Sequence, residues 1–127
     1  MKWTAVGALL MALAVAMGAF GAHGLQDRLD AYSLSVYEKA VFYHFIHALG
    51  ILLVGVLARV TAITPAGQAR VGWLLFVGIV IFSGSLYALA LSGVRILGAI
   101  TPVGGLAFIL GWLMLAYEVL RVARVGR

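Results

Sequence analysis

Three histidines have the most chemically versatile side chains in this sequence. His44 and His47 are three residues apart, so on a helix both imidazoles share one face, and His23 precedes them. Imidazole nitrogens bind transition metals or haem, and they donate hydrogen bonds to quinone or lipid carbonyl groups. The sequence contains no cysteine, and Glu38 lies on a different helical face from the histidine pair. The pair alone is therefore a weak indication of a metal site.

Four hydroxyl-bearing residues extend this polar set: Ser83, Ser85, Tyr87 and Thr101. Inside a membrane such residues commonly join helices through hydrogen bonds, each worth about 0.6 kcal/mol. We therefore favour structural hydrogen bonding for the seven residues. A pocket for a lipid, a quinone or another hydrophobic molecule is the second interpretation, and a haem or metal site is the third. We predict neither a resident metal nor a cofactor.

The composition requires an apolar solvent around the chain. Of its 127 residues, 65% are hydrophobic and 10% are charged, and the mean hydropathy is +1.13. Soluble domains have about half apolar and a quarter charged residues, and so small a core cannot hide the excess apolar surface. These figures exclude a secreted domain, a soluble enzyme and a nucleic-acid-binding module. We expect the lipid bilayer, and no nucleic acid, as a partner.

Four apolar runs are long enough to cross a bilayer, for which about 20 helical residues are needed. They predict membrane spans at about 3–22, 38–58, 70–93 and 101–120 in one domain covering residues 1–127. The first run is longer than the apolar region of a signal peptide, so we expect it to be a retained span. Because the connections are short, the spans form an antiparallel four-helix bundle.

Sequence signals mark where three of the helices begin. Ser35 and Glu38 have the spacing of a capping box, and Thr64 and Thr101 each stand as an N-cap before a proline. The outer loop 23–35 has apolar residues at helical spacing. It is compatible with a helix lying flat on the membrane surface or with an ordinary connection.

The basic residues predict the orientation in the membrane. Both termini of a four-span chain lie on one side, which holds six of the nine: Lys2, Arg59, Arg70, Arg121, Arg124 and Arg127. Both termini are therefore expected in the cytoplasm. This topology places the histidines and the four hydroxyl-bearing residues in the outer half of the bundle, with Tyr37 in an outer aromatic belt. Glu118, near the inner end, is expected to pair with Arg121 or Arg70.

Small residues are expected to hold the bundle together, because lipid offers helices no hydrophobic reason to associate. The predicted packing glycines are Gly18, Gly21, Gly84, Gly104 and Gly111. A minority interpretation is that some of the glycines make room for a lipid tail or a flat ligand.

Four sequence blocks resemble one known family of small membrane proteins. They are GAFGAHGL at 18–25, YH at 43–44 with His47, FSGSLY at 82–87, and GAITPVGG at 98–105 followed by GW at 111–112. Together they resemble the family called domain of unknown function 423, and they are similar to the eukaryotic transmembrane protein 256. The resemblance implies a four-helix protein of the bacterial inner membrane. It implies no reaction, substrate or cofactor.

The motifs of common enzymes are absent from the sequence, which has no P-loop, no H-E-x-x-H and no G-x-S-x-G elbow. It also has no acidic residue near the middle of a span, where a proton-coupled transporter would need one. We therefore predict a non-enzymatic accessory subunit or small scaffold. Its expected partners are other membrane-protein chains, in a complex or a homo-oligomer. A lipid- or quinone-binding protein is the alternative, and a haem or metal protein or a channel is a lesser one.

Overall fold

The computed structural model of the protein describes residues 2–126, which form four long helical stretches without any β-strand among them. The stretches are Lys2–Leu25, Ala31–Arg59, Pro65–Ser92 and Arg95–Val125, and each is long and apolar enough to cross a membrane. The prediction of an all-helical protein with four candidate spans is confirmed.

Three of the four stretches combine different types of helix. The elements are α1 (Lys2–Phe20), the π-helix η1 (Gly21–Leu25), α2 (Ala31–Arg59), α3 (Pro65–Gly78), the π-helix η2 (Ile79–Ser83), α4 (Gly84–Ser92), the 3-10 helix η3 (Arg95–Ala99) and α5 (Thr101–Val125). Turns of π-helix inside longer helices are rare and occur often at functional sites. The two π-helical segments η1 and η2 are therefore places to look for a functional site.

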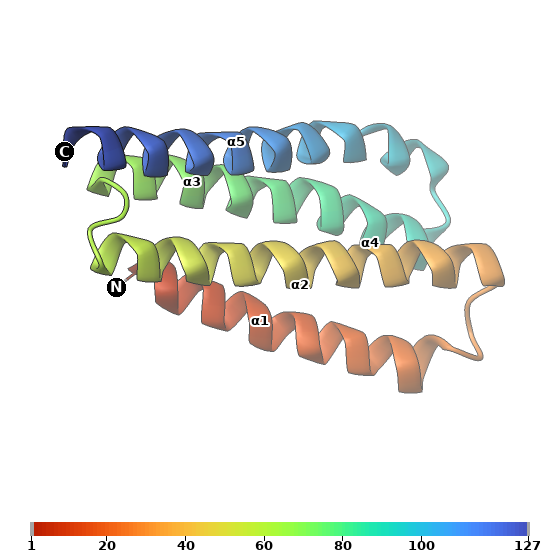
Figure 1. The fold of residues 1–127 in the computed structure, drawn as a ribbon. Helices are drawn as coiled ribbons and strands as arrows, with labels where there is room; N and C mark the ends of the chain where they lie inside the picture. Colours follow the sequence, from red (N-terminus) through yellow and green to blue (C-terminus); the bar gives the residue numbers. More distant parts are fainter. Residues whose placement is uncertain (1, 127) are drawn as a thin grey trace.

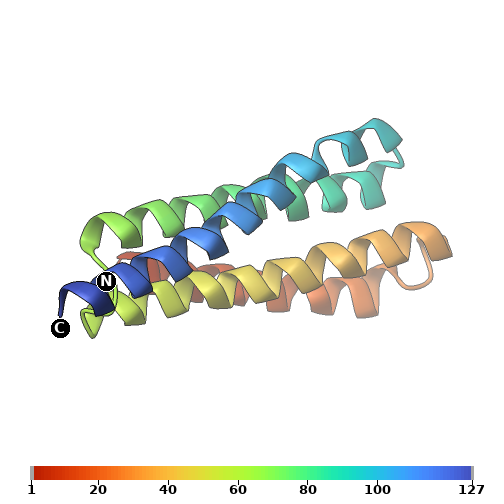
Figure 2. The ribbon, with the colours of Figure 1, turned by 45° about the horizontal axis from the view of Figure 1, so that its top comes forward.

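The four stretches lie side by side and are joined by short connections at alternating ends (Figure 1). We call one end, which holds both ends of the chain and the connection 60–64, the terminal end. The turn end holds the connections 26–30 and 93–94. Helix α2 contacts α1, α3, η2 and α4, whereas α5 packs against α3 and η2. Figure 2 shows α1 behind α2 and α5 running at an angle to α2. Helices α1 and α5 are therefore the outer ones.

Helix α2 begins earlier than the sequence analysis predicted. Its N-cap is Asp30, whose carboxylate accepts a 2.7 Å hydrogen bond from the Ser33 amide. This bond holds the pKa of Asp30 below its usual range. The predicted capping box at Ser35 is wrong, because residues 31–35 already belong to α2. The helix begins seven residues before position 38, where the membrane span was predicted to start. The sequence estimate followed the bilayer thickness of about 30 Å, whereas the 29 residues of α2 extend for about 43 Å.

The two threonine–proline pairs behave differently. Thr64 is the N-cap of α3 and accepts a 3.0 Å hydrogen bond from the Gly67 amide, as predicted. Thr101 is not an N-cap, because the chain before it is already helical. The preceding η3 places Ile100 in that position, and the Ile100 carbonyl accepts from the Val103 amide at 3.0 Å. The hydroxyl of Thr101 is consequently free to bond elsewhere.

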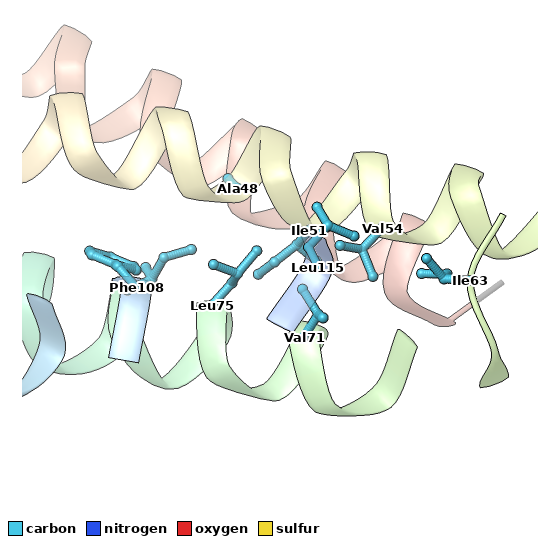
Figure 3. Packing of buried hydrophobic residues seen from close by; sticks show 9 residues of the cluster. Ala48, Ile51, Val54, Ile63, Val71, Leu75, Phe108 and Leu115 are labelled. Carbon is cyan, nitrogen blue, oxygen red and sulfur yellow. The ribbon is translucent and has the colours of Figure 1, made fainter. Parts of the chain in front are cut away.

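The hydrophobic core has two parts. Near the terminal end, side chains of α2, α3 and α5 converge, among them Ile51, Val54, Leu75 and Leu115 (Figure 3). Towards the turn end, a second cluster joins η1, α2 and α4 through Leu25, Tyr37, Ala40, Leu86 and neighbours. Along α2, the histidines at 44 and 47 lie between the two clusters.

The predicted packing glycines differ in how closely other residues approach them. A Cβ on Gly104 would strike the backbone of Phe82, and one on Gly111 would lie 2.7 Å from Leu75. A Cβ on Gly21 would lie 2.5 Å from the Tyr37 ring, whereas one on Gly18 would make an ordinary 3.4 Å contact with Val41. Gly84 differs from the prediction, because nothing lies within 4 Å of its Cβ position. It faces away from the other helices.

Candidate functional site

His44 lies in the middle of α2 and is almost completely buried, with 2% of its surface exposed. Its Nδ1 is 3.0 Å from the hydroxyl of Tyr87, a residue of α4. Its Nε2 is buried and has no hydrogen-bond partner among the residues that the structure describes. His44 therefore connects the centre of α2 with α4.

His47 is oriented by its own helix rather than by another one. Its Nδ1 donates a 2.6 Å hydrogen bond to the Tyr43 carbonyl one turn earlier, which leaves Nε2 of a neutral ring as an acceptor. The imidazole stacks on Phe108 of α5, with ring centroids 3.4 Å apart and planes inclined by 12°. His47 thus joins α2 and α5 by stacking, and its hydrogen bond among the described residues stays within α2.

The serines and the threonine form two further bridges. Ser83 in η2 is completely buried and donates a 2.8 Å hydrogen bond to the Ala40 carbonyl of α2. The Ser85 hydroxyl in α4 donates to the Phe82 carbonyl at 3.0 Å and lies 2.6 Å from the Thr101 hydroxyl of α5. Because the Ser85 hydroxyl donates its only proton to the Phe82 carbonyl, the Thr101 hydroxyl must be the donor in its contact with Ser85.

The seven residues singled out in the sequence therefore form separate contacts instead of one cluster. His23 is exposed on η1, apart from the others. His44 and His47 lie within two residues of the midpoint of α2, because this helix begins at Ala31 and ends at Arg59. Within residues 2–126, no group of three histidine, aspartate or glutamate side chains is placed to hold a metal ion.

Tyr37 was expected in an exposed aromatic belt, but it is 1% exposed. Its hydroxyl donates to the Met17 carbonyl of α1, and its ring meets that of Tyr87 edge to face, with centroids 5.3 Å apart. Tyr37, Tyr87 and His44 thus form a continuous polar and aromatic contact from α1 through α2 to α4. The helical spacing of residues 37, 40, 44 and 47 carried this signal, because it places Tyr37 on the histidine face.

A second buried polar group lies near the terminal end. Glu118 of α5 is fully buried and accepts hydrogen bonds from Thr64 and Arg121, both at 2.9 Å. Arg70 lies 3.6 Å from its other oxygen, so the carboxylate contacts both arginines that the sequence proposed. A Cβ on Gly67 would collide with the carboxylate. Glu118 therefore fastens α5 to the start of α3.

A groove with a polar rim lies elsewhere, between α1 and α2 near the turn end. This α1–α2 groove has a volume of about 390 Å³. It is lined by Gly18, Gly21, Ala22, Val41, Phe42 and Phe45, together with Gln26, Leu34, Tyr37 and Glu38. None of the seven predicted site residues lines it, although two of the predicted packing glycines do.

Comparison with known proteins places the chain in a family. Its four apolar helices define it as a multi-pass membrane protein, and the family described as a protein of unknown function (DUF423) matches residues 17–105. The chain belongs to this family.

Several relatives match almost the whole chain. A UPF0382 membrane protein of Staphylococcus saprophyticus is 54% identical over 117 residues, covering 92% of this chain and 95% of the relative. The UPF0382 membrane protein YwdK of Bacillus subtilis is 50% identical over 111 residues, covering 87% and 89%. No solved structure matches.

Proposed function

We propose that this membrane protein is a non-enzymatic accessory subunit or small scaffold of a larger membrane complex. The observation that carries the proposal is how its internal polar groups are used. Tyr87, Ser83 and Thr101 each hydrogen-bond to a neighbouring helix of the same chain. Hydroxyl groups that are hydrogen-bonded between helices stabilise the bundle, and they are not free to perform acid–base or nucleophilic chemistry.

The outward face of α1 supports the proposal that another membrane protein packs against this chain. It presents a row of exposed alanines at positions 5, 8, 12, 16 and 19. Small residues allow helix backbones to approach closely, and this packing is what drives helix association in lipid. Lipid chains alone require no such row, so we assign this face to a neighbouring membrane helix.

We further propose that the bundle is inserted antiparallel in a bacterial inner membrane with both termini in the cytoplasm. Lys2, Arg59, Arg70, Arg121 and Arg124 belong to the terminal end, whereas Arg28, Lys39 and Arg95 belong to the turn end. Arg127, counted with the first group in the sequence, lies outside the described residues. The excess of basic residues supports a cytoplasmic terminal end.

Co-purification tests the subunit proposal. The full chain is extracted from its native membrane in several mild detergents, and the proteins recovered with it are identified by mass spectrometry. We expect at least one other membrane protein in a fixed ratio to this chain, with loss of that protein from an Ala12→Leu variant. Recovery of only a monomer or a homo-oligomer from every detergent contradicts an accessory role.

A further inference from the structure

The α1–α2 groove has the position and size of a ligand site. Helix α1 diverges from α2 towards the turn end (Figure 1), and the groove of about 390 Å³ opens between them there. Ligand pockets usually enclose roughly 300–1,000 Å³. None of the histidines lines the groove, although Tyr37 contributes both to its lining and to the contact with Tyr87.

The walls of the groove are apolar and follow the helix axes. Val41, Phe42 and Phe45 of α2 form one wall, and Gly18 of α1 faces them. Residues 34, 38, 41, 42 and 45 share one face of α2, and they span about 16 Å along its axis. The missing side chain at Gly18 leaves this space open. A long and flexible hydrocarbon chain fits such a surface.

The rim of the groove is polar and carries one charge. Gln26 and Glu38 are the polar side chains that line it besides Tyr37, whose hydroxyl is bonded to α1. Glu38 is exposed, and the ion pairs within residues 2–126 all belong to Glu118. Its neighbours one helical turn away, Leu34, Ser35, Val41 and Phe42, carry no positive charge. Within residues 2–126 the carboxylate therefore forms no ion pair at the mouth of an apolar groove.

The depth of Glu38 in the bilayer would allow its carboxylate to contact a lipid headgroup. It lies seven residues into α2, about 10 Å from the helix start. A helix of about 43 Å centred on a hydrocarbon layer of about 30 Å projects about 6–7 Å at each end. Glu38 then stands about 3–4 Å on the hydrocarbon side of the boundary with the headgroups, with Phe42 and Phe45 at greater depth.

We propose that the α1–α2 groove binds a phospholipid with a primary ammonium headgroup, such as phosphatidylethanolamine. The ammonium group meets the Glu38 carboxylate and the amide oxygen of Gln26, and one acyl chain lies along Phe42 and Phe45. An ammonium group donates three hydrogen bonds to such acceptors. A choline headgroup has the same charge without these donors, and a glycerol headgroup has no cation, so both bind less well.

Native mass spectrometry of the full chain tests the headgroup. The protein is released from nanodiscs containing equal amounts of phosphatidylethanolamine, phosphatidylcholine and phosphatidylglycerol. We expect one phosphatidylethanolamine retained per chain, several-fold above the other two lipids, and loss of this preference in Glu38→Gln. The matched control is Lys39→Gln, which neutralises the adjacent exposed charge outside the groove and should keep the preference. Equal retention of the three lipids, or an unchanged preference in Glu38→Gln, overturns the proposal.

A second pair of variants tests the acyl-chain position. Gly18→Leu fills the groove, whereas Ala19→Leu adds the same side chain at the neighbouring exposed position. Only Gly18→Leu should lower lipid retention, with circular dichroism used to verify that both variants are folded. Equal retention by the two folded variants contradicts the proposal. If Gly18→Leu does not fold, Glu38→Gln still decides the matter. Neither result depends on a protein partner, so this proposal and the subunit proposal fail separately.

Discussion

His44 and Tyr87 show how single residues hold this protein together. A polar group in hydrocarbon is expensive unless it is paired, and the 3.0 Å contact between Nδ1 and the phenol hydroxyl joins the middle of α2 to α4. The opposite nitrogen of His44 has no partner among the described residues. The stabilisation from this residue should therefore come mainly from one bond.

A double-mutant cycle measures that bond. Tyr87→Phe and His44→Leu each remove one partner, and the double variant removes both. We expect a coupling free energy of about 0.6 kcal/mol, the average for hydrogen bonds between membrane helices. The free energy of unfolding is followed in mixed detergent micelles. Strictly additive effects would mean that the two side chains do not interact.

Close backbone approach is a second residue-scale feature. A Cβ on Gly104 would meet the backbone of Phe82, whereas nothing lies within 4 Å of the Cβ position on Gly84. Gly104→Ala should therefore lower the free energy of unfolding by about 1–3 kcal/mol, the usual cost of overpacking. Gly84→Ala is the matched control and should be neutral or slightly stabilising, because alanine favours helix. Similar unfolding curves for the two variants would contradict this packing.

The sequence indicated which polar residues of α2 share one helical face, but it did not indicate which residues they contact. Helical spacing placed Tyr37, His44 and His47 on one face of α2, and all three are buried there. Spacing within one helix cannot reveal which neighbouring helix supplies the partner. For this reason the pairing of Ser85 with Thr101 and the stacking of His47 on Phe108 required the three-dimensional structure.

At the scale of elements, helix starts explain where sequence reasoning succeeded and failed. Thr64 caps α3 because an irregular connection precedes it and leaves the first amides without partners. Thr101 has the same local sequence, yet η3 comes immediately before it and supplies carbonyl acceptors. An identical dipeptide therefore has two roles, which are decided by the conformation of the preceding residues.

The Asp30 cap makes the start of α2 sensitive to pH. Its pKa is lower in the folded protein than in the unfolded chain, because the Ser33 amide donates to the carboxylate. The cap therefore stabilises α2 at any pH above the unfolded value of about 3.9. This contribution is lost as the pH falls through the folded value.

Amide hydrogen exchange at Ser33 checks this expectation. Exchange should accelerate in acid, after correction for the intrinsic rate, as Asp30 becomes protonated. Asp30→Asn is the matched control, since asparagine caps helices about as well and does not titrate in this range. Equal pH dependence in the two proteins would show that another group controls the first turn of α2.

At the scale of the whole molecule, composition was sufficient for the architecture. Four long apolar runs predicted the four apolar helical stretches that residues 2–126 contain. The α1–α2 groove could not be predicted, because it depends on the divergence of α1 from α2 over several turns. The burial of Glu118 was missed for a related reason, because it depends on the distant Gly67 leaving room for the carboxylate.

Single-cysteine labelling tests the proposed orientation, and the absence of native cysteine makes it straightforward. In intact cells, a membrane-impermeant maleimide should label Val94→Cys at the turn end. Ala66→Cys at the terminal end should react only after permeabilisation, because the proposed orientation puts the end with more basic residues in the cytoplasm. The reverse labelling pattern would place both termini outside.

Photo-crosslinking from α1 in living cells tests the central proposal, the accessory role, most directly. A photoreactive amino acid replaces Ala12, which faces outward, and in a control it replaces Ala14, which is fully buried against the bundle. We predict that position 12 forms an adduct with one defined membrane protein and that position 14 crosslinks only within the chain. If position 12 and the other exposed alanines of α1 yield only lipid adducts or adducts between copies of this chain, the protein is not an accessory subunit that docks through α1.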